Sequence, residues 1–335
     1  MLNFQKVQNK ERKKEPLIMK HTHILTMAAA ILSLTITSTV YAENTDTTTQ
    51  NLLDSYTDII SDIPYIDDGN ENHMLDLYGT SNISENTPVV VEVHGGGFIG
   101  GNKTTNKEHS ILFANSGFEV VTPDYVKLPD NSFVDAVQDL FAAYQWVADQ
   151  ADTYHFDLNN IFLDGDSAGG YYVLLTQAIW NSPELQEYFG VTVPNYNFSA
   201  IITSAPEYNL YDTQKLIDKD GNAVVKGPAG YTASSIGAKY LYDDDLMKHL
   251  YFANYVDPSI FEGCYVCSTP SDTMTRESTL EFTNWLDEAD VSFTFADYED
   301  QGSGLMHVFN IGHPTFPESV QANNDMIAYM QSLIK

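Results

Sequence analysis

Short β-rich runs alternate with amphipathic helical segments along most of this chain of 335 residues. The apolar residues of Val134–Ala148 and of Glu277–Leu286 recur at helical spacing. The β-rich runs are Met74–Tyr78, Val89–Val93, Glu119–Pro123, Ile161–Leu163, Ala200–Thr203, Cys264–Ser268 and Val291–Ala296. This alternation predicts an α/β fold, in which a mostly parallel central sheet carries helices on both of its faces.

One connection is too long for a single crossover helix. Some sixty residues separate the β-rich run that ends near Ser204 from the run that begins at Cys264. We therefore expect a small cap insertion, at about residues 207–261, over the carboxyl edge of the sheet. The insertion holds seven of the 21 tyrosines in the chain, which is about twice the share that its length predicts.

The N-terminal segment has the layout of a secretory signal peptide. Five basic residues between Lys10 and Lys20 precede an apolar run, Ile24–Leu34, and small residues follow as far as Ala42. The apolar run is shorter than a bilayer-spanning helix requires, which argues against a permanent membrane anchor. We predict that residues 1–42 are a signal peptide and that cleavage after Ala42 releases a secreted or extracytoplasmic protein.

The remaining chain, residues 43–335, is predicted to be one domain. It opens with a Thr-rich stretch, Glu43–Gln50, interpreted as a linker, and an amphipathic stretch, Leu52–Ile60, interpreted as a helix. Translation from Met1 and translation from Met19 both remain open, because each start leaves a basic segment ahead of the apolar run.

The acidic charge of the chain argues against polyanionic partners. Sixteen basic residues stand against 46 acidic ones, for a formal net charge of −30. Repulsion from phosphate groups therefore disfavours nucleic acids and anionic membrane surfaces as partners of the processed protein. A calcium site is possible but unsupported, because Asp243-Asp244-Asp245 lacks the alternating ligands of a calcium loop.

The two cysteines, Cys264 and Cys267, have the Cys-x-x-Cys spacing of redox and metal sites. A zinc site needs two further ligands, and a redox pair normally opens a helix rather than lying in a strand. We expect two buried, inert thiols.

The motif Gly165-Asp166-Ser167-Ala168-Gly169 follows a β-rich run and precedes a helical one, Tyr171–Ile179. Gly-x-Ser-x-Gly at such a junction is typical of a nucleophile elbow, where a sharp turn exposes the serine at the edge of a sheet. By itself the motif is weak evidence, because small residues are common in ordinary turns.

A second glycine motif strengthens this interpretation. His94-Gly95-Gly96-Gly97 follows the apolar run Val89–Val93, and consecutive glycines allow backbone N–H groups to point at one developing negative charge. Two such motifs, each at the carboxyl end of a strand and 73 residues apart, are far more specific than either alone.

The two motifs resemble those of the α/β-hydrolase superfamily, specifically the hormone-sensitive-lipase-like carboxylesterases. The resemblance includes Leu75–Tyr78, similar to the second strand of these enzymes, and Pro123–Tyr125, similar to the turn after a later strand. It extends from Leu75 to the C-terminus, and it implies the α/β-hydrolase fold.

The resemblance also implies the order nucleophile, acid, base along the chain. Ser167 is then the nucleophile, Asp272 the acid and His307 the base. His313 is the alternative base, while His249 falls within the insertion.

By the same resemblance, the backbone N–H groups of Gly96, Gly97 and Ala168 form the oxyanion hole, and Gly95 shapes the loop. Such a site transfers an acyl group from an ester to serine and then to water. It needs no metal and no organic cofactor.

The sequence therefore predicts an exported serine carboxylesterase for short-chain acyl esters, including acetylated carbohydrates, with a small-molecule or carbohydrate ester as its partner. An amidase of the formamidase type uses the same residues and is one alternative. A non-catalytic hydrolase-like binding module is another, and reactivity of Ser167 toward a fluorophosphonate distinguishes it. The acyl length, the alcohol and the oligomeric state remain open.

Overall fold

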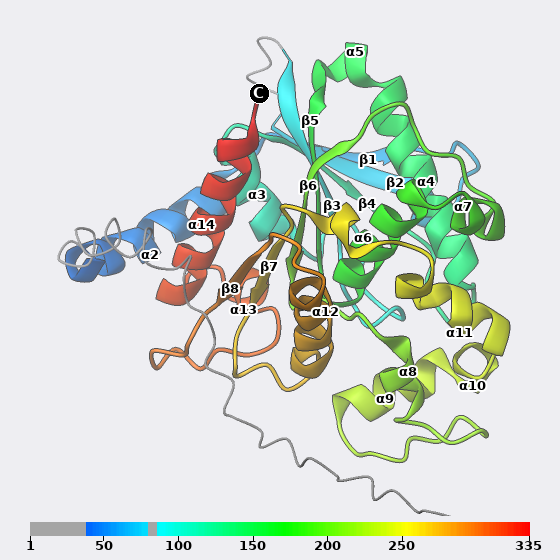
Figure 1. The fold of residues 1–335 in the computed structure, drawn as a ribbon. Coiled ribbons are helices and arrows are strands. Elements are labelled where there is room, and N and C mark those ends of the chain that lie inside the picture. Colours follow the sequence, from blue (N-terminus) through cyan, green and yellow to red (C-terminus); the bar gives the residue numbers. More distant parts are fainter. Residues whose placement is uncertain (1–37, 80–85) are drawn as a thin grey trace, which may run out of the picture. The chain divides into compact units, whose positions relative to one another are not determined.

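A computed structural model describes residues 38–79 and 86–335 of the chain (Figure 1). Within these residues a sheet of eight strands has the order β1-β2-β4-β3-β5-β6-β7-β8. The strands are β1 (Ile59–Pro64), β2 (Met74–Tyr78), β3 (Thr87–Val93), β4 (Glu119–Pro123), β5 (Phe156–Asp166), β6 (Phe198–Ser204), β7 (Tyr265–Ser268) and β8 (Thr294–Asp297). Strand β2 runs antiparallel to β1 and β4, and all other neighbours are parallel. The predicted α/β-hydrolase fold with a mostly parallel sheet is confirmed.

Helices cover both faces of this sheet, as Figure 1 shows. One face packs against α4 (Phe133–Asp149), α6 (Ser167–Asn181), α7 (Pro183–Phe189) and α12 (Arg276–Glu288). The other face packs against α3 (Lys107–Asn115) and α14 (Pro317–Leu333). The short helices α5 (Ala151–Tyr154) and α13 (Phe309–Gly312) lie in connections.

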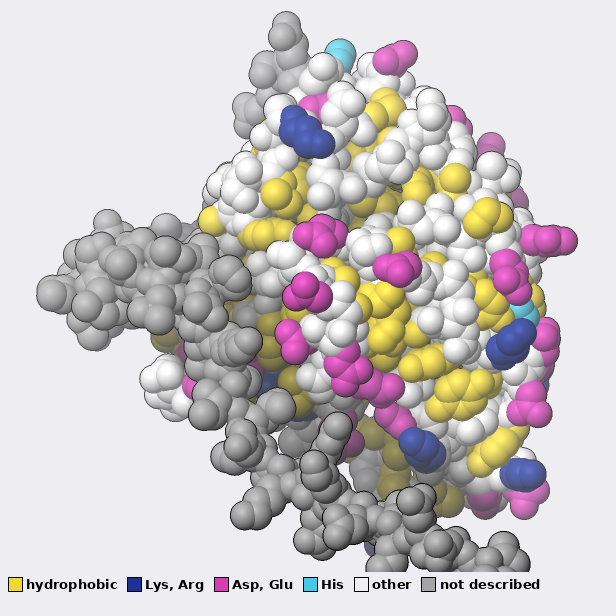
Figure 2. Space-filling model, viewed as in Figure 1, with side chains coloured by type: hydrophobic (Ala, Val, Ile, Leu, Met, Phe, Trp, Pro, Cys, Tyr) yellow, Lys and Arg dark blue, Asp and Glu magenta, His cyan; other side chains and the backbone are white. Residues whose placement is uncertain are grey.

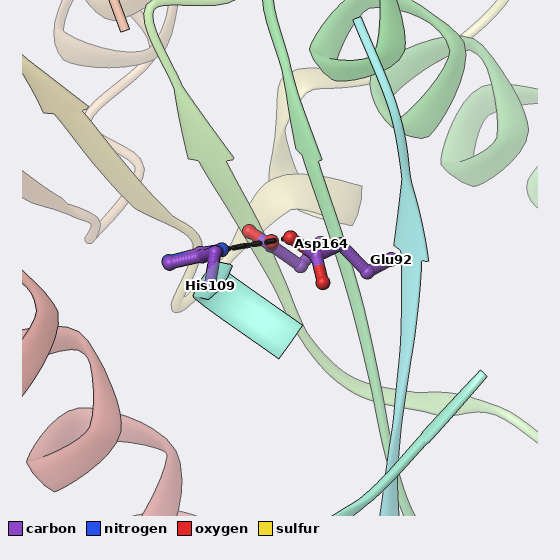
Figure 3. Close-up of side chains that lie close together, drawn as sticks. All are labelled: Glu92, His109 and Asp164. Atoms are coloured by element: carbon purple, nitrogen blue, oxygen red, sulfur yellow. Dashed lines mark hydrogen bonds and ion pairs between the residues drawn. The ribbon is translucent and has the colours of Figure 1, made fainter. Parts of the chain in front are cut away.

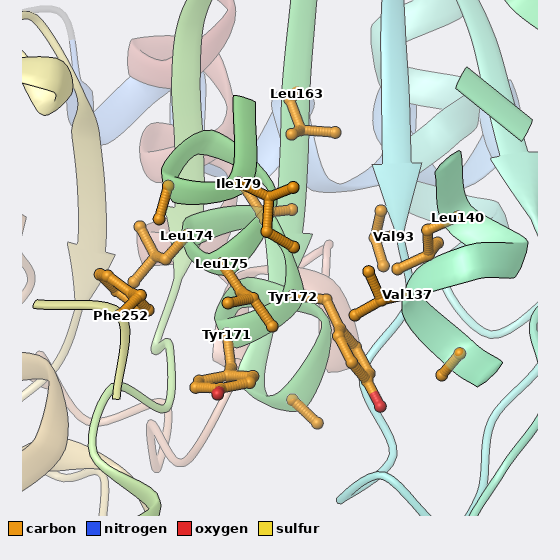
Figure 4. Close-up of a cluster of buried hydrophobic side chains, with 14 of the residues drawn as sticks. Val93, Val137, Leu140, Leu163, Tyr171, Tyr172, Leu174, Leu175, Ile179 and Phe252 are labelled. Atoms are coloured by element: carbon orange, nitrogen blue, oxygen red, sulfur yellow. The ribbon is translucent and has the colours of Figure 1, made fainter. Parts of the chain in front are cut away.

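The central strands are buried on both faces, which explains their continuous apolar sequences. In β3, Val89, Val91 and Val93 belong to the cluster on the α6 face, and Val90 belongs to the cluster on the α3 face. Figure 4 shows Val93 of β3 facing side chains of α4 and α6. This packing fixes the carboxyl ends of β3 and β5, where both glycine motifs begin.

The segment 207–261 between β6 and β7 contains several short helices joined by loops. They are α8 (Leu210–Gln214), α9 (Pro228–Ile236), α10 (Ala238–Leu241), α11 (Asp244–Leu250), η3 (Phe252–Asn254) and η4 (Pro258–Phe261). The Tyr171 hydroxyl donates to the Leu250 carbonyl over 2.7 Å, and the buried Phe252 belongs to the same apolar cluster as α6. The insertion is therefore anchored on helix α6, which begins at Ser167.

The structure corrects the prediction at the N-terminal side. The stretch Leu52–Ile60 is not one helix, because α2 (Ser38–Ser55) ends before Tyr56 and β1 begins at Ile59. Pairing with β2 makes the second half a strand, and such tertiary pairing is invisible to local periodicity. The stretch Glu43–Gln50, interpreted as a linker, is helical within α2.

The predicted signal peptide, residues 1–42, lies outside the described residues except for its last five, which fall in α2. The chain divides after Asn44, and every feature discussed below belongs to Thr45–Lys335. In the described part of the chain, no helix combines the length and the apolar character that crossing a membrane requires.

The prediction for the two cysteines is confirmed. Cys264 and Cys267 are buried and form no disulfide. Burial raises the pKa of the Cys264 thiol to about 12 and that of Cys267 further, so both thiols stay protonated at neutral pH.

Candidate active site

Ser167 stands at the junction of β5 and α6. Strand β5 ends at Asp166, and Ser167 is the first residue of the helix. Its backbone φ is 51°, in the left-handed region that residues with a side chain rarely adopt. This strained turn is the geometry of a nucleophile elbow, and it turns the serine out of the strand direction at the sheet edge.

Two glycines of the motif permit the turn. A Cβ atom on Gly169 would lie 2.1 Å from the Val93 carbonyl oxygen and 2.6 Å from that of His94. A Cβ atom on Gly165 would lie 2.8 Å from the Gly169 carbonyl oxygen. Glycine is therefore required for helix α6 to approach the end of β3.

We expect Gly169→Ala to destabilise the fold by about 3 kcal/mol or more, because the added methyl group meets rigid backbone. Gly312→Ala is the matched control, since no atom lies within 4 Å of its Cβ position, and we expect a change within about 1 kcal/mol. Urea denaturation measures both values. Equal stability of the two variants would contradict the close approach at Gly169.

The structure brings the three predicted residues of the site together. The His307 Nε2 atom lies 2.8 Å from the Ser167 Oγ atom, and its Nδ1 atom lies 3.0 Å from the Asp272 Oδ2 atom. Asp272 follows β7 and His307 follows β8, so three strand ends supply the chain of hydrogen bonds. With Nδ1 donating to the carboxylate, Nε2 is free to take the serine proton.

The two other histidines considered from the sequence lie elsewhere. His313 stacks on Phe316, with ring centroids 4.6 Å apart, and His249 stacks on Tyr188, with centroids 3.6 Å apart. Neither has a hydrogen bond to Ser167 among the described residues.

Asp272 is held in position and kept ionised. Burial opposes its ionisation, but the hydrogen bond and charge of His307, and the N–H of Met274 at 2.7 Å, together lower the pKa of this carboxyl below its ordinary value. The Thr275 hydroxyl lies 3.0 Å from Asp272 Oδ2 and 2.8 Å from the Ala205 carbonyl oxygen. Thr275 was not among the predicted site residues, although its position three residues after Asp272 is a usable signal for local side-chain hydrogen bonding.

Asp166 joins the two glycine motifs. Its buried carboxylate accepts hydrogen bonds from the Gly95 N–H and from the Asn106 side-chain amide, each over 2.8 Å. Gly96 and Gly97 have φ values of 124° and 60°, which glycine alone adopts readily. The loop is thus fixed beside the elbow, while the oxyanion-hole role of Gly96, Gly97 and Ala168 stays a prediction.

The insertion reaches this loop. A Cβ atom on Gly97 would lie 2.8 Å from the Thr232 side chain of helix α9. Part of the segment 207–261 therefore lies directly over the predicted oxyanion donors.

A hollow of about 480 Å³ lies between the insertion and helix α12. Its lining combines aromatic rings with acidic and amide groups: Tyr208, Tyr251, Glu277, Leu280, Glu281, Asn284, Trp285 and Glu288. Figure 2 shows acidic side chains gathered over this part of the viewed face, with hydrophobic ones beside them. A lining of aromatic rings and carboxylates suits a neutral polar ligand with apolar faces, and its negative charges repel anions.

Glu207 is hydrogen-bonded to the backbone of Ser167. Its backbone N–H donates to the Ser167 carbonyl over 3.1 Å, and its carboxylate accepts a hydrogen bond from the Ser278 hydroxyl. Burial raises the pKa of this carboxyl to about 7. No sequence signal marked Glu207, because its environment forms only when the segment after β6 packs on α12.

The raised pKa of Glu207 predicts a pH effect on stability. Between its ordinary value of 4.5 and about 7, the unfolded chain releases the proton and the folded protein retains it, so stability falls as pH rises. We expect Glu207→Gln to reduce the loss of stability between pH 5 and pH 8 by about 2 kcal/mol. Urea denaturation of both proteins at the two pH values measures it. Identical pH dependence would contradict the shifted pKa.

Comparison with known proteins identifies the family. The family described as BD-FAE, a hormone-sensitive-lipase-like α/β-hydrolase family, matches residues 75–275 of the chain. The chain belongs to the BD-FAE family. The matched range includes both glycine motifs and Asp272, and His307 lies beyond it.

Relatives of this BD-FAE protein share parts of its sequence and its fold. A probable carboxylic ester hydrolase, LipM of Mycobacterium tuberculosis, is 30% identical over 166 residues, which cover 47% of this chain and 36% of the relative. The alignments span 26–43% of the length of the curated relatives. The structure of esterase B from Lactobacillus rhamnosis has a TM-score of 0.73 at 24% identity and covers 90% of this chain and 96% of its own. A truncated carbohydrate esterase from gut microbiota has a TM-score of 0.64 at 17% identity and covers 84% and 97%.

Proposed function

We propose that this protein is a serine carboxylesterase that hydrolyses short-chain acyl esters. One observation carries the proposal: an unbroken chain of hydrogen bonds runs from the Ser167 hydroxyl through the His307 ring to the Asp272 carboxylate. This arrangement removes the proton from a hydroxyl as it attacks a carbonyl, which an isolated serine does poorly near pH 7.

In the proposed reaction, the Ser167 Oγ atom bonds to the ester carbonyl carbon and its proton passes to His307 Nε2. The N–H groups of Gly96, Gly97 and Ala168 stabilise the negative oxygen of the tetrahedral intermediate. The C–O bond to the alcohol then breaks, and His307 gives its proton to the leaving alcohol. Water, deprotonated by the same ring, hydrolyses the acyl-serine and releases the acid.

We further propose that the alcohol part of the substrate is a carbohydrate carrying acetyl groups. The hollow between the insertion and α12 includes none of Ser167, Asp272 and His307 in its lining, and it supports this choice as a contact for the sugar away from the reacting ester. The rings of Tyr208, Tyr251 and Trp285 offer apolar faces there, beside the carboxylates of Glu277 and Glu281. Sugars combine apolar ring faces with hydroxyl donors, which such a lining accommodates. The fold shared with a carbohydrate esterase from gut microbiota is consistent with it.

The first test measures kcat/KM for p-nitrophenyl acetate, butyrate and octanoate. A second test measures acetate release from an acetylated xylo-oligosaccharide and cleavage of the amide p-nitroacetanilide. We expect kcat/KM to fall with acyl length and acetate to be released from the oligosaccharide. Faster cleavage of octanoate would contradict the short-chain preference. Cleavage of the anilide without ester hydrolysis would favour the amidase alternative instead.

We propose that the protein is exported, with residues 1–42 removed as a signal peptide. The basic segment, the short apolar run and Ala42 support this proposal. Sequencing the N-terminus of the protein recovered outside the cytoplasm is the test. A mature chain that begins at Glu43 agrees with the proposal, and an intact Met1 or Met19 end contradicts it.

A further inference from the structure

Three ionisable side chains that form no hydrogen bond to the Ser167 hydroxyl in the described structure lie close together (Figure 3). Glu92 comes from β3, Asp164 from β5 and His109 from α3. Glu92 and Asp164 are direct partners in the register of the two parallel strands, so their side chains leave the same face of the sheet. Helix α3 packs on that face and supplies the imidazole. All three side chains are at most 1% exposed.

The hydrogen bonds of this cluster are incomplete. His109 Nδ1 lies 2.8 Å from Glu92 Oε1 and 3.7 Å from Asp164 Oδ2. The Ser110 hydroxyl donates to Glu92 Oε2 over 2.5 Å. Within residues 38–79 and 86–335, neither carboxylate oxygen of Asp164 has a hydrogen-bond partner, and neither does His109 Nε2. Buried carboxylates normally accept hydrogen bonds or pair with a positive charge, so the buried carboxylate of Asp164 is unfavourable unless another group compensates it.

No lysine or arginine in the described part of the chain supplies that compensation. Among the described residues, the only ion-pair partner of Glu92 or of Asp164 is His109. Two acidic groups and one imidazole, sealed from water, are the charge set that a divalent cation neutralises.

We propose that Glu92, His109 and Asp164 form a buried structural site for a divalent metal ion of the zinc type. One oxygen or nitrogen atom from each residue lies within 4.8 Å of the others. Ligand atoms of a tetrahedral zinc ion are about 3.3 Å apart. The distances of 2.8 Å and 3.7 Å from His109 Nδ1 to the two carboxylates fall on either side of that value. An imidazole ligand favours zinc over calcium or magnesium, which prefer oxygen ligands alone.

The position of the site suggests what the ion does. Glu92 stands two residues before His94, at the start of the glycine loop, and Asp164 stands three residues before Ser167. An ion at this point ties α3 to the ends of β3 and β5, which carry both motifs. It stabilises the scaffold of the proposed active site and takes no part in the acyl transfer.

The test loads the protein with metal during folding, because the site is closed in the folded state. The full chain is unfolded in guanidinium with a chelator and refolded with zinc chloride or with chelator alone. Bound zinc is counted by mass spectrometry after gel filtration, and Tm is measured. We expect one zinc ion per chain and a higher Tm for the zinc-loaded protein. Absence of bound zinc, with equal Tm values, overturns the proposal.

Variants assign the ligands. Asp164→Asn and His109→Gln are expected to lose the bound zinc and the gain in Tm, whereas His73→Gln is expected to keep both. His73 is a control because it pairs with Asp68 and Asp139 outside the cluster. Equal zinc content in all variants would overturn the assignment.

If a ligand variant does not fold, binding of Co²⁺ to the unmodified protein tests whether the proposed site holds a metal ion. Refolding with Co²⁺ in place of zinc is expected to give a visible absorption band that differs in position and intensity from that of Co²⁺ in buffer, because imidazole and carboxylate ligands replace its water molecules. A spectrum identical to that of Co²⁺ in buffer would overturn the proposal.

Discussion

Replacing Ser167 by alanine is expected to lower kcat for p-nitrophenyl acetate by about a million-fold, down to the rate that binding and the oxyanion donors alone sustain. The Oγ atom accepts the acyl group in the proposed reaction, and no other hydroxyl is within hydrogen-bond distance of His307 Nε2 in the described structure. The variant removes one hydroxyl and no apolar contact, so its Tm is expected to stay close to that of the unmodified protein.

The chain offers a matched control for this substitution. Ser303→Ala also removes one hydroxyl, in the loop after β8, where Ser303 bonds to Glu318 rather than to the site. We expect unchanged kcat in Ser303→Ala. Loss of less than about tenfold in Ser167→Ala would contradict the assignment of the nucleophile.

Replacing Asp272 by asparagine is expected to lower kcat about 10⁴-fold with little change in KM. The carboxylate accepts a hydrogen bond from the Nδ1–H group of His307 over 3.0 Å, and it balances the positive charge that the ring acquires. An amide that donates to Nδ1 instead holds the wrong tautomer, so Nε2 carries the proton and cannot accept another.

Asp287→Asn is the control for the acid. Asp287 lies exposed on α12, and the same chemical change there is expected to leave kcat unaltered. Steady-state kinetics of both variants provide the measurement. Similar activity in Asp272→Asn and in the unmodified protein would show that another carboxylate orients the base.

The sequence predicted those parts of the site that local patterns encode. Runs such as Val89–Val93 are apolar without alternation because both faces are buried, and each glycine motif follows such a run. Parallel strands end at one edge, so side chains following β5, β7 and β8 had to meet there. The elbow motif marked Ser167, the resemblance to the carboxylesterases implied Asp272 and His307, and the three residues lie together in the structure.

Other parts depend on contacts between distant segments, which one sequence does not encode locally. Three features depend on such contacts: the pairing of β1 with β2, the hydrogen bond from Glu207 to Ser167, and the hydrogen bond from Gly95 to Asp166. The meeting of Glu92 with Asp164 depends on a strand register, and that of both with His109 depends on how α3 packs. Single charged residues within apolar strands were the available signal for that cluster.

The most direct test of the central claim is covalent labelling of Ser167 by a fluorophosphonate, followed by peptide mass spectrometry. The probe reacts with a serine only when a neighbouring base activates it. We predict one adduct per chain, on the peptide that contains Ser167, and a large loss of labelling rate in His307→Ala. Absence of an adduct at Ser167, or an equal rate in His307→Ala, would contradict the serine esterase mechanism and favour a non-catalytic binding module.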